Sequence, residues 1–336
     1  MTSAPNSSSE DKAVTYLEAI RQALREEMAR DPSVFILGED VGIYGGAFGV
    51  TKGLYEEFGA RRVIDTPISE SLIVGAAAGA ALMGCRPVAE MQFADFISCG
   101  FDQVVNQIGT MRYRHNGRVS VPLVIRCPSG GNIHGSMYHS QNPEGWFFHT
   151  PGLLIACPAT PYDAKGLLKA AIRGNDPVLF FEYKFLYRRL KEVLPEHDYT
   201  VPFGQAAVRR QGRDLSIIAY GSSVYYSLEA AQELARDGVE AEVLDLRTLR
   251  PLDKGAIFQT VARTGRVLIT HEDWRTGGAG AEIAAMLVEE QFDRLDAPIV
   301  RVCSCNTPVP FSPVLEAQHL PLPEKIVAAA RRLVKA

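Results

Sequence analysis

Short apolar segments alternate with helical segments along most of this chain. Among them are "VFIL" (34–37), "PLVIRC" (122–127), "PVLFFE" (177–182), "LSIIAY" (215–220) and "AEVLDL" (241–246). Strands that lack alternating polar positions are buried on both faces, which is typical of parallel sheets covered by helices on each side. The pattern therefore predicts an α/β fold built on mostly parallel sheets.

The chain has 336 residues, more than one typical domain holds, so two domains are expected. The alternation breaks at residues 186–206, where charge and proline accumulate without a clear period. We therefore predict a first α/β domain over 13–190, a linker over 191–206 and a second α/β domain over 207–336. Residues 1–12 are polar, lack the apolar core of a signal peptide and are expected to form a disordered tail.

The first predicted helix covers residues 15–30. Its apolar positions recur at helical spacing, namely Leu17, Ile20, Leu24 and Met28. Thr15 with Glu18 three residues later is the pattern of a capping box, in which each residue satisfies a backbone N–H of the other.

Charge and cysteine content narrow the class of protein. A net charge of -4 gives no electrostatic reason to expect a nucleic acid or an anionic membrane as partner. No apolar run approaches the roughly 20 residues that cross a bilayer. The six cysteines show no Cys-x-x-Cys spacing, which argues against a zinc site and favours a reducing, cytoplasmic location.

Glu70 is the first candidate functional residue. It stands in "VIDTPISESLIVGAAAGAALMG" (63–84), where an apolar strand gives way to a helix. The carboxyl edge of a parallel sheet is where such folds bind ligands, although a first-turn glutamate can also serve only the helix dipole. The helix that follows is rich in Ala and Gly, and this smooth surface predicts close packing of a second domain or subunit beside Glu70.

The second candidate is the glycine-rich stretch "PSGGNIHGSMYHSQNPEGWFFHT" (128–150). It holds His134, His139 and His149, and long irregular loops of this kind are often functional. No carboxylate or cysteine follows a known metal-ligand spacing, and Gly135-Ser136 lacks the nucleophile-elbow pattern of a hydrolase. We expect one or more of these histidines to do acid–base work.

A third candidate is "EMQFADF" (90–96), which ends a predicted strand with Gln92, Phe93, Asp95 and Phe96. An aromatic residue here is usually part of a core. At a sheet edge beside Glu70, an exposed ring could instead stack on a flat heterocycle.

Together these stretches resemble a known family over nearly the whole chain. The motifs occur in order as "LGEDVG" (37–42), "DTPISE" (65–70), "EMQFADF" (90–96), "YHSQNPE" (138–144), "TPYDAKGLL" (160–168) and "HEDWRTGGAGAE" (271–282). The sequence is similar to the beta subunits of the thiamin-diphosphate-dependent decarboxylating component of 2-oxo acid dehydrogenase complexes. The resemblance implies a pyrimidine-binding α/β domain followed by a transketolase C-terminal-like domain, in an α2β2 heterotetramer.

The resemblance also implies roles for individual residues. Glu70 matches the glutamate that contacts the aminopyrimidine nitrogen of thiamin diphosphate, Phe96 the aromatic residue that stacks on that ring, and Gln92 a polar residue lining the same pocket. His139 matches the active-site histidine of the loop where the 2-oxo acid substrate and the lipoyl group meet. Glu70 and His139 are therefore the expected catalytic residues.

The absence of one motif indicates that a partner subunit is needed. The chain contains no Gly-Asp-Gly segment, which in this class of enzyme holds the diphosphate through magnesium. The resemblance thus implies that a separate alpha subunit supplies magnesium and the diphosphate site, while a lipoyl acyltransferase core receives the acyl group. Two alternatives remain: a self-contained transketolase-like thiamin enzyme and a non-catalytic structural homologue.

The motifs do not agree on one substrate, and the residues at the potassium position differ from those of relatives. "QFADF" (92–96) and "EYKFLYR" (182–188) favour branched-chain 2-oxo acids, whereas "HEDWRTGG" (271–278) favours pyruvate or acetoin. Relatives hold a potassium ion partly through an aspartate where this chain has Gly174, although Asn175 and Asp176 remain as ligands for such an ion.

Overall fold

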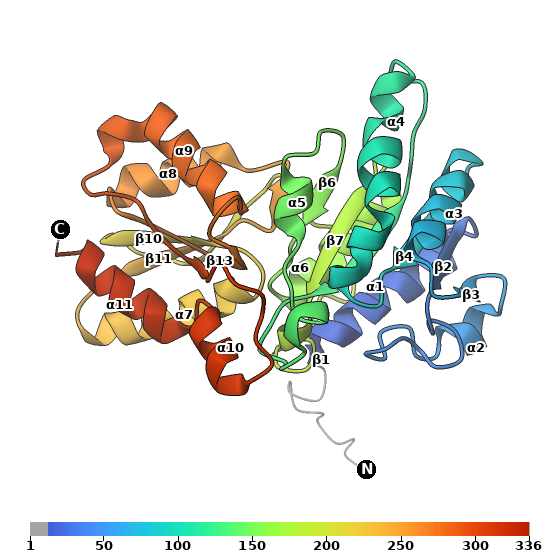
Figure 1. Cartoon of the computed structure of the whole chain (residues 1–336), viewed down its shortest axis with the longest axis horizontal. Helices are drawn as coiled ribbons and strands as arrows, with labels where there is room; N and C mark the ends of the chain where they lie inside the picture. Colours follow the sequence, from blue (N-terminus) through green and yellow to red (C-terminus); the bar gives the residue numbers. More distant parts are fainter. Residues whose placement is uncertain (1–12, 336) are drawn as a thin grey trace, which may run out of the picture.

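The computed structural model describes residues 13–335, so the tail expected at residues 1–12 lies outside the described residues. Two sheets, each covered by helices, lie side by side (Figure 1). The α/β prediction is confirmed: each apolar segment quoted at the outset forms a strand in one of these sheets.

The first sheet has seven strands in the order β12-β6-β7-β5-β4-β2-β3. They are β2 (Val34–Gly38), β3 (Val63–Asp65), β4 (Arg86–Glu90), β5 (Val124–Ser129), β6 (Leu154–Ala156), β7 (Val178–Tyr183) and β12 (Thr248–Arg250). All neighbours pair in parallel except β12, which runs antiparallel to β6. A short strand from the second half of the chain therefore completes the edge of the first sheet.

The elements around this sheet include six α-helices and four short helical turns. The α-helices are α1 (Tyr16–Arg30), α2 (Leu54–Phe58), α3 (Glu70–Leu82), α4 (Gly109–Arg114), α5 (Glu144–Phe148) and α6 (Pro161–Arg173). The turns are η2 (Ala94–Gly100), η3 (Gln103–Ile108), η4 (Ser136–Tyr138) and η5 (Lys184–Leu186). The N-terminal half of the chain also contains a two-stranded antiparallel pair, β1 (Val14–Thr15) with β8 (Lys191–Glu192).

The second sheet has five strands in the order β14-β13-β10-β11-β9. They are β9 (Ala207–Arg210), β10 (Leu215–Ala219), β11 (Ala241–Asp245), β13 (Val267–Trp274) and β14 (Val300–Ser304), and only β9 is antiparallel to its neighbour. Its helices are α7 (Ser222–Arg236), α8 (Lys254–Thr264), α9 (Ala279–Gln291), η6 (Phe292–Arg294), α10 (Pro313–His319) and α11 (Pro323–Leu333).

Helix α1 begins as its sequence predicts. Thr15 Oγ1 accepts from the backbone N–H of Glu18 at 3.2 Å, and Glu18 Oε2 accepts from the backbone N–H of Thr15 at 2.7 Å. This reciprocal capping box stabilises the helix by roughly 1 kcal/mol.

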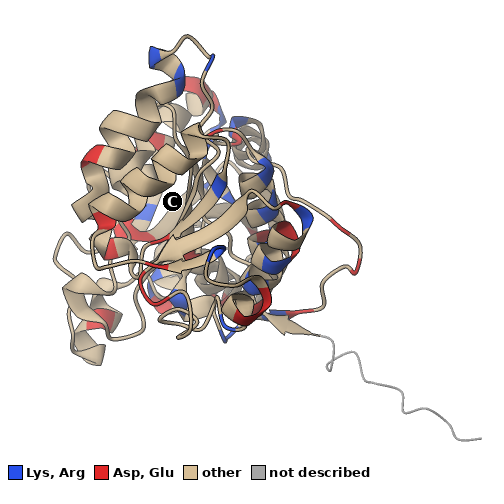
Figure 2. Ribbon diagram, turned by 90° about the vertical axis from the view of Figure 1, so that its right-hand side faces the viewer, with Lys and Arg blue, Asp and Glu red and all other residues tan. Residues whose placement is uncertain are grey.

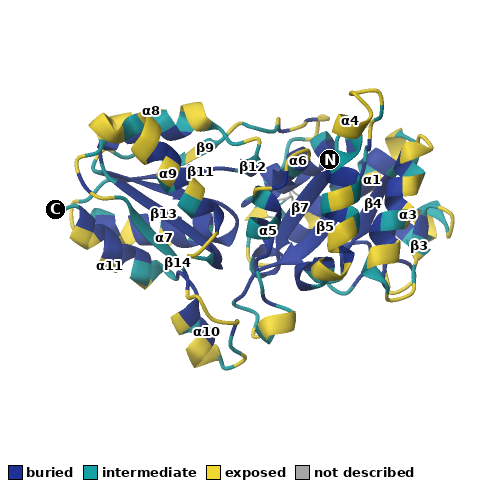
Figure 3. Cartoon of the chain, turned by 45° about the horizontal axis from the view of Figure 1, so that its top comes forward, coloured by how far each residue is buried: buried dark blue, intermediate teal, exposed yellow. Residues whose placement is uncertain are grey.

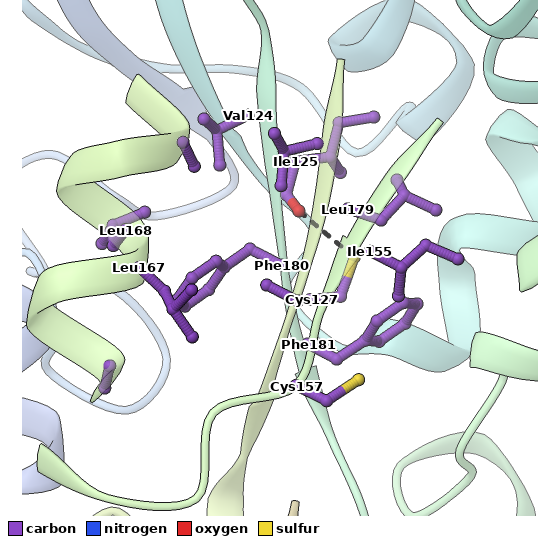
Figure 4. Packing of buried hydrophobic residues seen from close by; sticks show 14 of the residues in the cluster. Val124, Ile125, Cys127, Ile155, Cys157, Leu167, Leu168, Leu179, Phe180 and Phe181 are labelled. Atoms are coloured by element: carbon purple, nitrogen blue, oxygen red, sulfur yellow. Dashed lines mark hydrogen bonds between the residues drawn. The ribbon is translucent and has the colours of Figure 1, made fainter. Parts of the chain in front are cut away.

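The core of the first half lies between the central strands and α6 (Figure 4). Every residue of β5 and β7 is buried, as expected for strands covered on both faces. Phe180 of β7 extends toward Leu167 of α6, whereas Phe181 lies on the opposite side of the strand. Truncating either ring to alanine would cost about 3–5 kcal/mol, so this packing fixes the sheet that carries the site.

The surface carries mixed charge. Lys and Arg are interspersed with Asp and Glu over the face shown in Figure 2. None of the helices among the described residues is long and apolar enough to cross a membrane. Figure 3 shows that the central strands of both sheets are buried and that exposed residues concentrate on the outer helices, while the edge strands β9 and β14 are mostly half-buried.

Candidate active site

Glu70 is the first residue of α3 and lies just beyond the carboxyl end of β3. It is half-buried. The adjacent strand β2 ends at Gly38 and is followed by Glu39, a buried residue whose Oε1 has no hydrogen-bond partner among residues 13–335. Burial first, and then the charges of Glu70 and Asp40, raise the pKa of Glu39. Three carboxyl groups therefore meet at this edge of the sheet.

Gln92 and Phe96 follow β4 at the same edge. Gln92 Nε2 lies 3.4 Å from Asp40 Oδ2, which connects it to the carboxyl cluster. Phe96 is half-buried within η2, and this turn packs on the start of α3: a Cβ at Gly100 would lie 3.3 Å from the carbonyl oxygen of Glu70. The turn that carries Phe96 is thus packed against the first residue of α3.

His139 follows η4 and is half-buried. Its ring meets Phe93 edge-on, with centroids 4.4 Å apart, and Phe96 with centroids 5.8 Å apart. Asp95, buried beside them, accepts from the backbone N–H of Gln141 at 3.0 Å. Burial raises the pKa of Asp95, and the neighbouring Lys184 and His139 counter that rise. The structure therefore brings His139 and Phe96 into contact.

The other two histidines of the stretch 128–150 lie elsewhere. His134 Nδ1 contacts Glu316 Oε2 at 2.6 Å, and Glu316 belongs to the second half of the chain. His149 is exposed and lines a cleft between the two halves together with Arg250 and Gly278. Of these three histidines, His139 is the one that contacts the predicted site residue Phe96, and its catalytic role stays a prediction.

Lys184 is a site residue that sequence reasoning missed. Its ammonium group is buried, donates to the carbonyl oxygen of Pro128 at 3.1 Å and lies 5.8 Å from the ring centroid of Phe93. Burial lowers the pKa of Lys184 to about 8, against the opposing effect of Asp95. In the sequence, it is a lysine two residues after the predicted strand 177–182.

The oxygens near the suggested potassium site already bind guanidinium groups. Arg86 donates to the side-chain oxygen of Asn175 at 3.1 Å and to the carbonyl oxygen of Gly174 at 2.6 Å. Arg112 pairs with Asp176 and donates to the carbonyl oxygen of Asn175 at 3.2 Å. Potassium here stays a prediction.

A cavity of about 690 Å³ adjoins the histidine-bearing stretch. Met137, Tyr138 and Gln141 line one side, and Trp274, Thr307 and Pro308 of the second half line the other. This volume is in the range of small-molecule sites, and mixed apolar and amide lining suits an extended, largely apolar group.

Two family models match the chain in tandem. "Transketolase, pyrimidine binding domain" matches residues 12–189, and "Transketolase, C-terminal domain" matches residues 204–326. The 2-oxoisovalerate dehydrogenase subunit beta of Bacillus subtilis (strain 168) is 49% identical over 323 residues, covering 96% of this chain and 99% of the relative. The chain belongs to the family of 2-oxo acid dehydrogenase beta subunits.

Other members of this beta-subunit family are similarly close. The acetoin:2,6-dichlorophenolindophenol oxidoreductase subunit beta of Cupriavidus necator is 47% identical, covering 94% of this chain and 96% of the relative. The pyruvate dehydrogenase E1 component subunit beta of Bacillus subtilis is 45% identical, covering 96% and 99%. A solved structure titled "Split gene transketolase, inactive beta4 tetramer" matches with a TM-score of 0.78 at 24% identity, covering 96% of this chain and 98% of that one, which shows the shared fold.

Proposed function

We propose that this beta subunit binds the aminopyrimidine ring of thiamin diphosphate and, with an alpha subunit, catalyses oxidative decarboxylation of a 2-oxo acid. The observation that carries this proposal is the position of Glu70, at the first turn of α3 and beside the carboxyls of Glu39 and Asp40. A flat nitrogen heterocycle needs a carboxylate at its edge and an aromatic ring at its face, and Glu70 with Phe96 fits that requirement. When bound, thiamin diphosphate supplies the electron sink for loss of carbon dioxide.

Glu70 would hold and return a proton at its carboxylate, against the ring nitrogen of the pyrimidine. A carboxylate shielded from water and fixed in place does this better than one in bulk solvent. Glu39 lies close enough to interact with this carboxylate, since the charge of Glu70, after burial, raises the pKa of Glu39. Gln92 would orient the ring edge through its amide, and Phe96 would exclude water from its face.

His139 would act in the later steps, as the proton donor or positioning group when the acyl group passes to a lipoyl carrier. Its ring contacts Phe93 and Phe96 edge-to-face, which fixes the position of the imidazole at this edge of the sheet. The adjoining cavity of about 690 Å³ offers a route for an extended arm such as lipoyl-lysine.

An alpha subunit would complete the site. Two large apolar side chains close to Glu70 in the sequence are exposed: Ile68 is 83% exposed and Leu72 is 51% exposed. Exposed large apolar side chains beside a candidate site are consistent with a surface that a partner covers. Because the chain lacks a Gly-Asp-Gly segment, the partner would carry magnesium and the diphosphate, giving an α2β2 heterotetramer.

We further propose a branched-chain 2-oxo acid as substrate, a lipoyl acyltransferase core as the acceptor complex and a cytoplasmic location. The branched-chain relative is 49% identical, whereas the acetoin and pyruvate relatives are 47% and 45% identical, which agrees with the preference drawn from "QFADF" (92–96).

Calorimetry with thiamin diphosphate and magnesium tests whether this chain needs an alpha subunit to bind the cofactor. The purified chain alone should show no binding, and the chain co-expressed with its alpha subunit should bind the cofactor. Binding and turnover by the chain alone would instead identify a self-contained transketolase-like enzyme. A lack of binding in both states would identify a non-catalytic homologue.

A further inference from the structure

The histidine loop, defined as residues 130–142, has a backbone that requires external support. Asn132, His134 and Ser136 adopt left-handed conformations, with φ of 60°, 60° and 64°. Three such residues within five positions persist only where their surroundings hold them. The loop ends at the Phe93 and Phe96 rings through His139, so whatever holds it also determines where His139 lies.

Two carboxylates from the second half of the chain provide that support. Glu316 of α10 accepts from the backbone N–H of Asn132 at 2.8 Å and of His134 at 3.2 Å, and it also contacts His134 Nδ1 at 2.6 Å. Glu272 of β13 accepts from the backbone N–H of Gly131 at 3.1 Å. Successive backbone N–H groups of this kind form a nest for an anion, and here the anions are side chains of the same protein.

Both carboxylates are buried and accept hydrogen bonds from the backbone of the loop. Glu316 is 1% exposed and Glu272 is 5% exposed. A buried carboxylate is costly unless hydrogen bonds compensate for lost water, and for Glu316 the donors of Asn132 and His134 provide that compensation. Figure 1 shows α10 projecting from the second half and reaching the loop that follows β5.

Close packing within the loop connects the residues that bind Glu316 to His139. Gly135, next to His134, is packed so closely that an added Cβ would lie 2.8 Å from the Cβ of His139. The backbone N–H of Gly135 also donates to Ser140 Oγ at 3.1 Å. A displacement of the nest would therefore be passed directly to His139.

We propose that Glu316 is a positioning residue for acyl transfer, which places His139 by fixing the left-handed backbone of the histidine loop. The proposal rests on the role proposed above for His139. Glu316 acts through the loop and does not touch the substrate. It follows that the second half of the chain, and not only the half that carries Glu70, controls the later steps of the reaction.

The test uses Glu316→Gln in the assembled complex with the alpha subunit. Glutamine preserves size, but its amide nitrogen is a donor that faces the donors of Asn132 or His134, so the loop relaxes. Two rates are measured: decarboxylation with 2,6-dichlorophenolindophenol as electron acceptor, and acylation of a free lipoyl domain. Acylation should fall by about tenfold or more, while decarboxylation stays within about threefold, since a tenfold loss needs only about 1.4 kcal/mol.

Two comparisons make the result decisive. Glu233→Gln, which removes a surface acid paired with Arg331, should leave both rates unchanged. The double variant Glu316→Gln with His139→Ala should be no slower in acylation than His139→Ala alone, because both act through one group. Equal losses in both rates, or an additive double variant, would assign Glu316 a merely structural role and overturn the proposal.

A readout apart from activity separates this inference from the proposed function. Hydrogen–deuterium exchange of residues 131–141 should be faster in Glu316→Gln than in the unmodified complex. Unchanged exchange overturns the positioning role whatever the enzyme's activity. Faster exchange, together with normal acylation by His139→Ala, would overturn the role of His139 and with it the proposal for Glu316.

Discussion

The carboxylate of Asp273 in β13 approaches the backbone of Gly145 in α5 so closely that an added Cβ would lie 2.3 Å from Asp273 Oδ2. Glu144, the preceding residue, is fully buried and accepts from the hydroxyl of Tyr183 at 3.3 Å. Two buried carboxyl groups from different halves of the chain therefore lie close together. Burial raises the pKa of Glu144, and the charge of Asp273 raises it further.

This pair makes the stability of the protein depend on pH. Burial raises the pKa of Asp273 to about 7, although hydrogen bonds from the backbone of Trp274 and Gly145 oppose the rise. Because the unfolded pKa is near 3.9, the folded chain binds the proton more tightly. The group therefore stabilises the fold fully at pH below about 4, and this contribution is lost as the pH rises through about 7.

Asp273→Asn should remove that dependence. The melting temperature of the variant relative to the unmodified chain should rise between about pH 5 and about pH 8, because asparagine needs no proton to stay neutral. Calorimetric melting at several pH values measures this. Asp237→Asn, at an exposed acid paired with Arg331, is the control and should show no such trend. A constant difference across the range would contradict the raised pKa.

Glu70→Gln should lower turnover of the assembled complex by about 10²-fold or more, because an amide cannot hold and return a proton. The tetramer should still form, since the substitution preserves shape at the first turn of α3. Steady-state rates and size-exclusion chromatography measure the two effects. Glu56→Gln, in the first turn of α2, serves as the matched control. Turnover close to that of the unmodified complex would exclude Glu70 as the catalytic acid.

Phe96→Ala should weaken binding of thiamin diphosphate to the assembled complex by roughly tenfold, because an aromatic contact contributes about 0.5–1.5 kcal/mol beyond buried area. Phe96→Tyr keeps the ring and should bind the cofactor nearly as tightly. Calorimetric titration of both variants provides the comparison. Equal weakening by alanine and tyrosine would indicate that Phe96 only packs against Phe93 and His139.

The parts of the fold that sequence reasoning predicted are those with a strong local signal. Strands such as β5 and β7 lack polar alternation, and the capping box of α1 is contained within four residues. The edge strand β12 has only three residues and one of them is Arg250, so no apolar pattern distinguishes it. Its place in the first sheet follows from long-range pairing with β6.

Among the candidate site residues, those with a local sequence signal were likewise predictable, and those that depend on long-range contacts were not. Glu70 was predictable because a strand-to-helix junction places any first-turn acid at the carboxyl edge of the sheet. Glu316 was not, because its partners Asn132 and His134 lie more than 180 residues away, as the hydrogen bonds between them record. Lys184 was missed for a related reason: its ammonium group contacts Phe93, which follows β4, and Pro128 of β5, and both are far from it in the sequence.

Leu72→Glu should prevent assembly with the alpha subunit. Leu72 lies on the outer face of α3, 51% exposed and two residues after Glu70, so a charge there would have to be buried unpaired in the proposed interface. The isolated chain should keep its circular dichroism and melting temperature, because the side chain faces solvent. Phe292→Glu, at a ring 67% exposed in the second half, should assemble normally. Sedimentation of the co-expressed chains distinguishes the two outcomes. A stable heterotetramer with Leu72→Glu would show that the alpha subunit does not bind the surface beside Glu70.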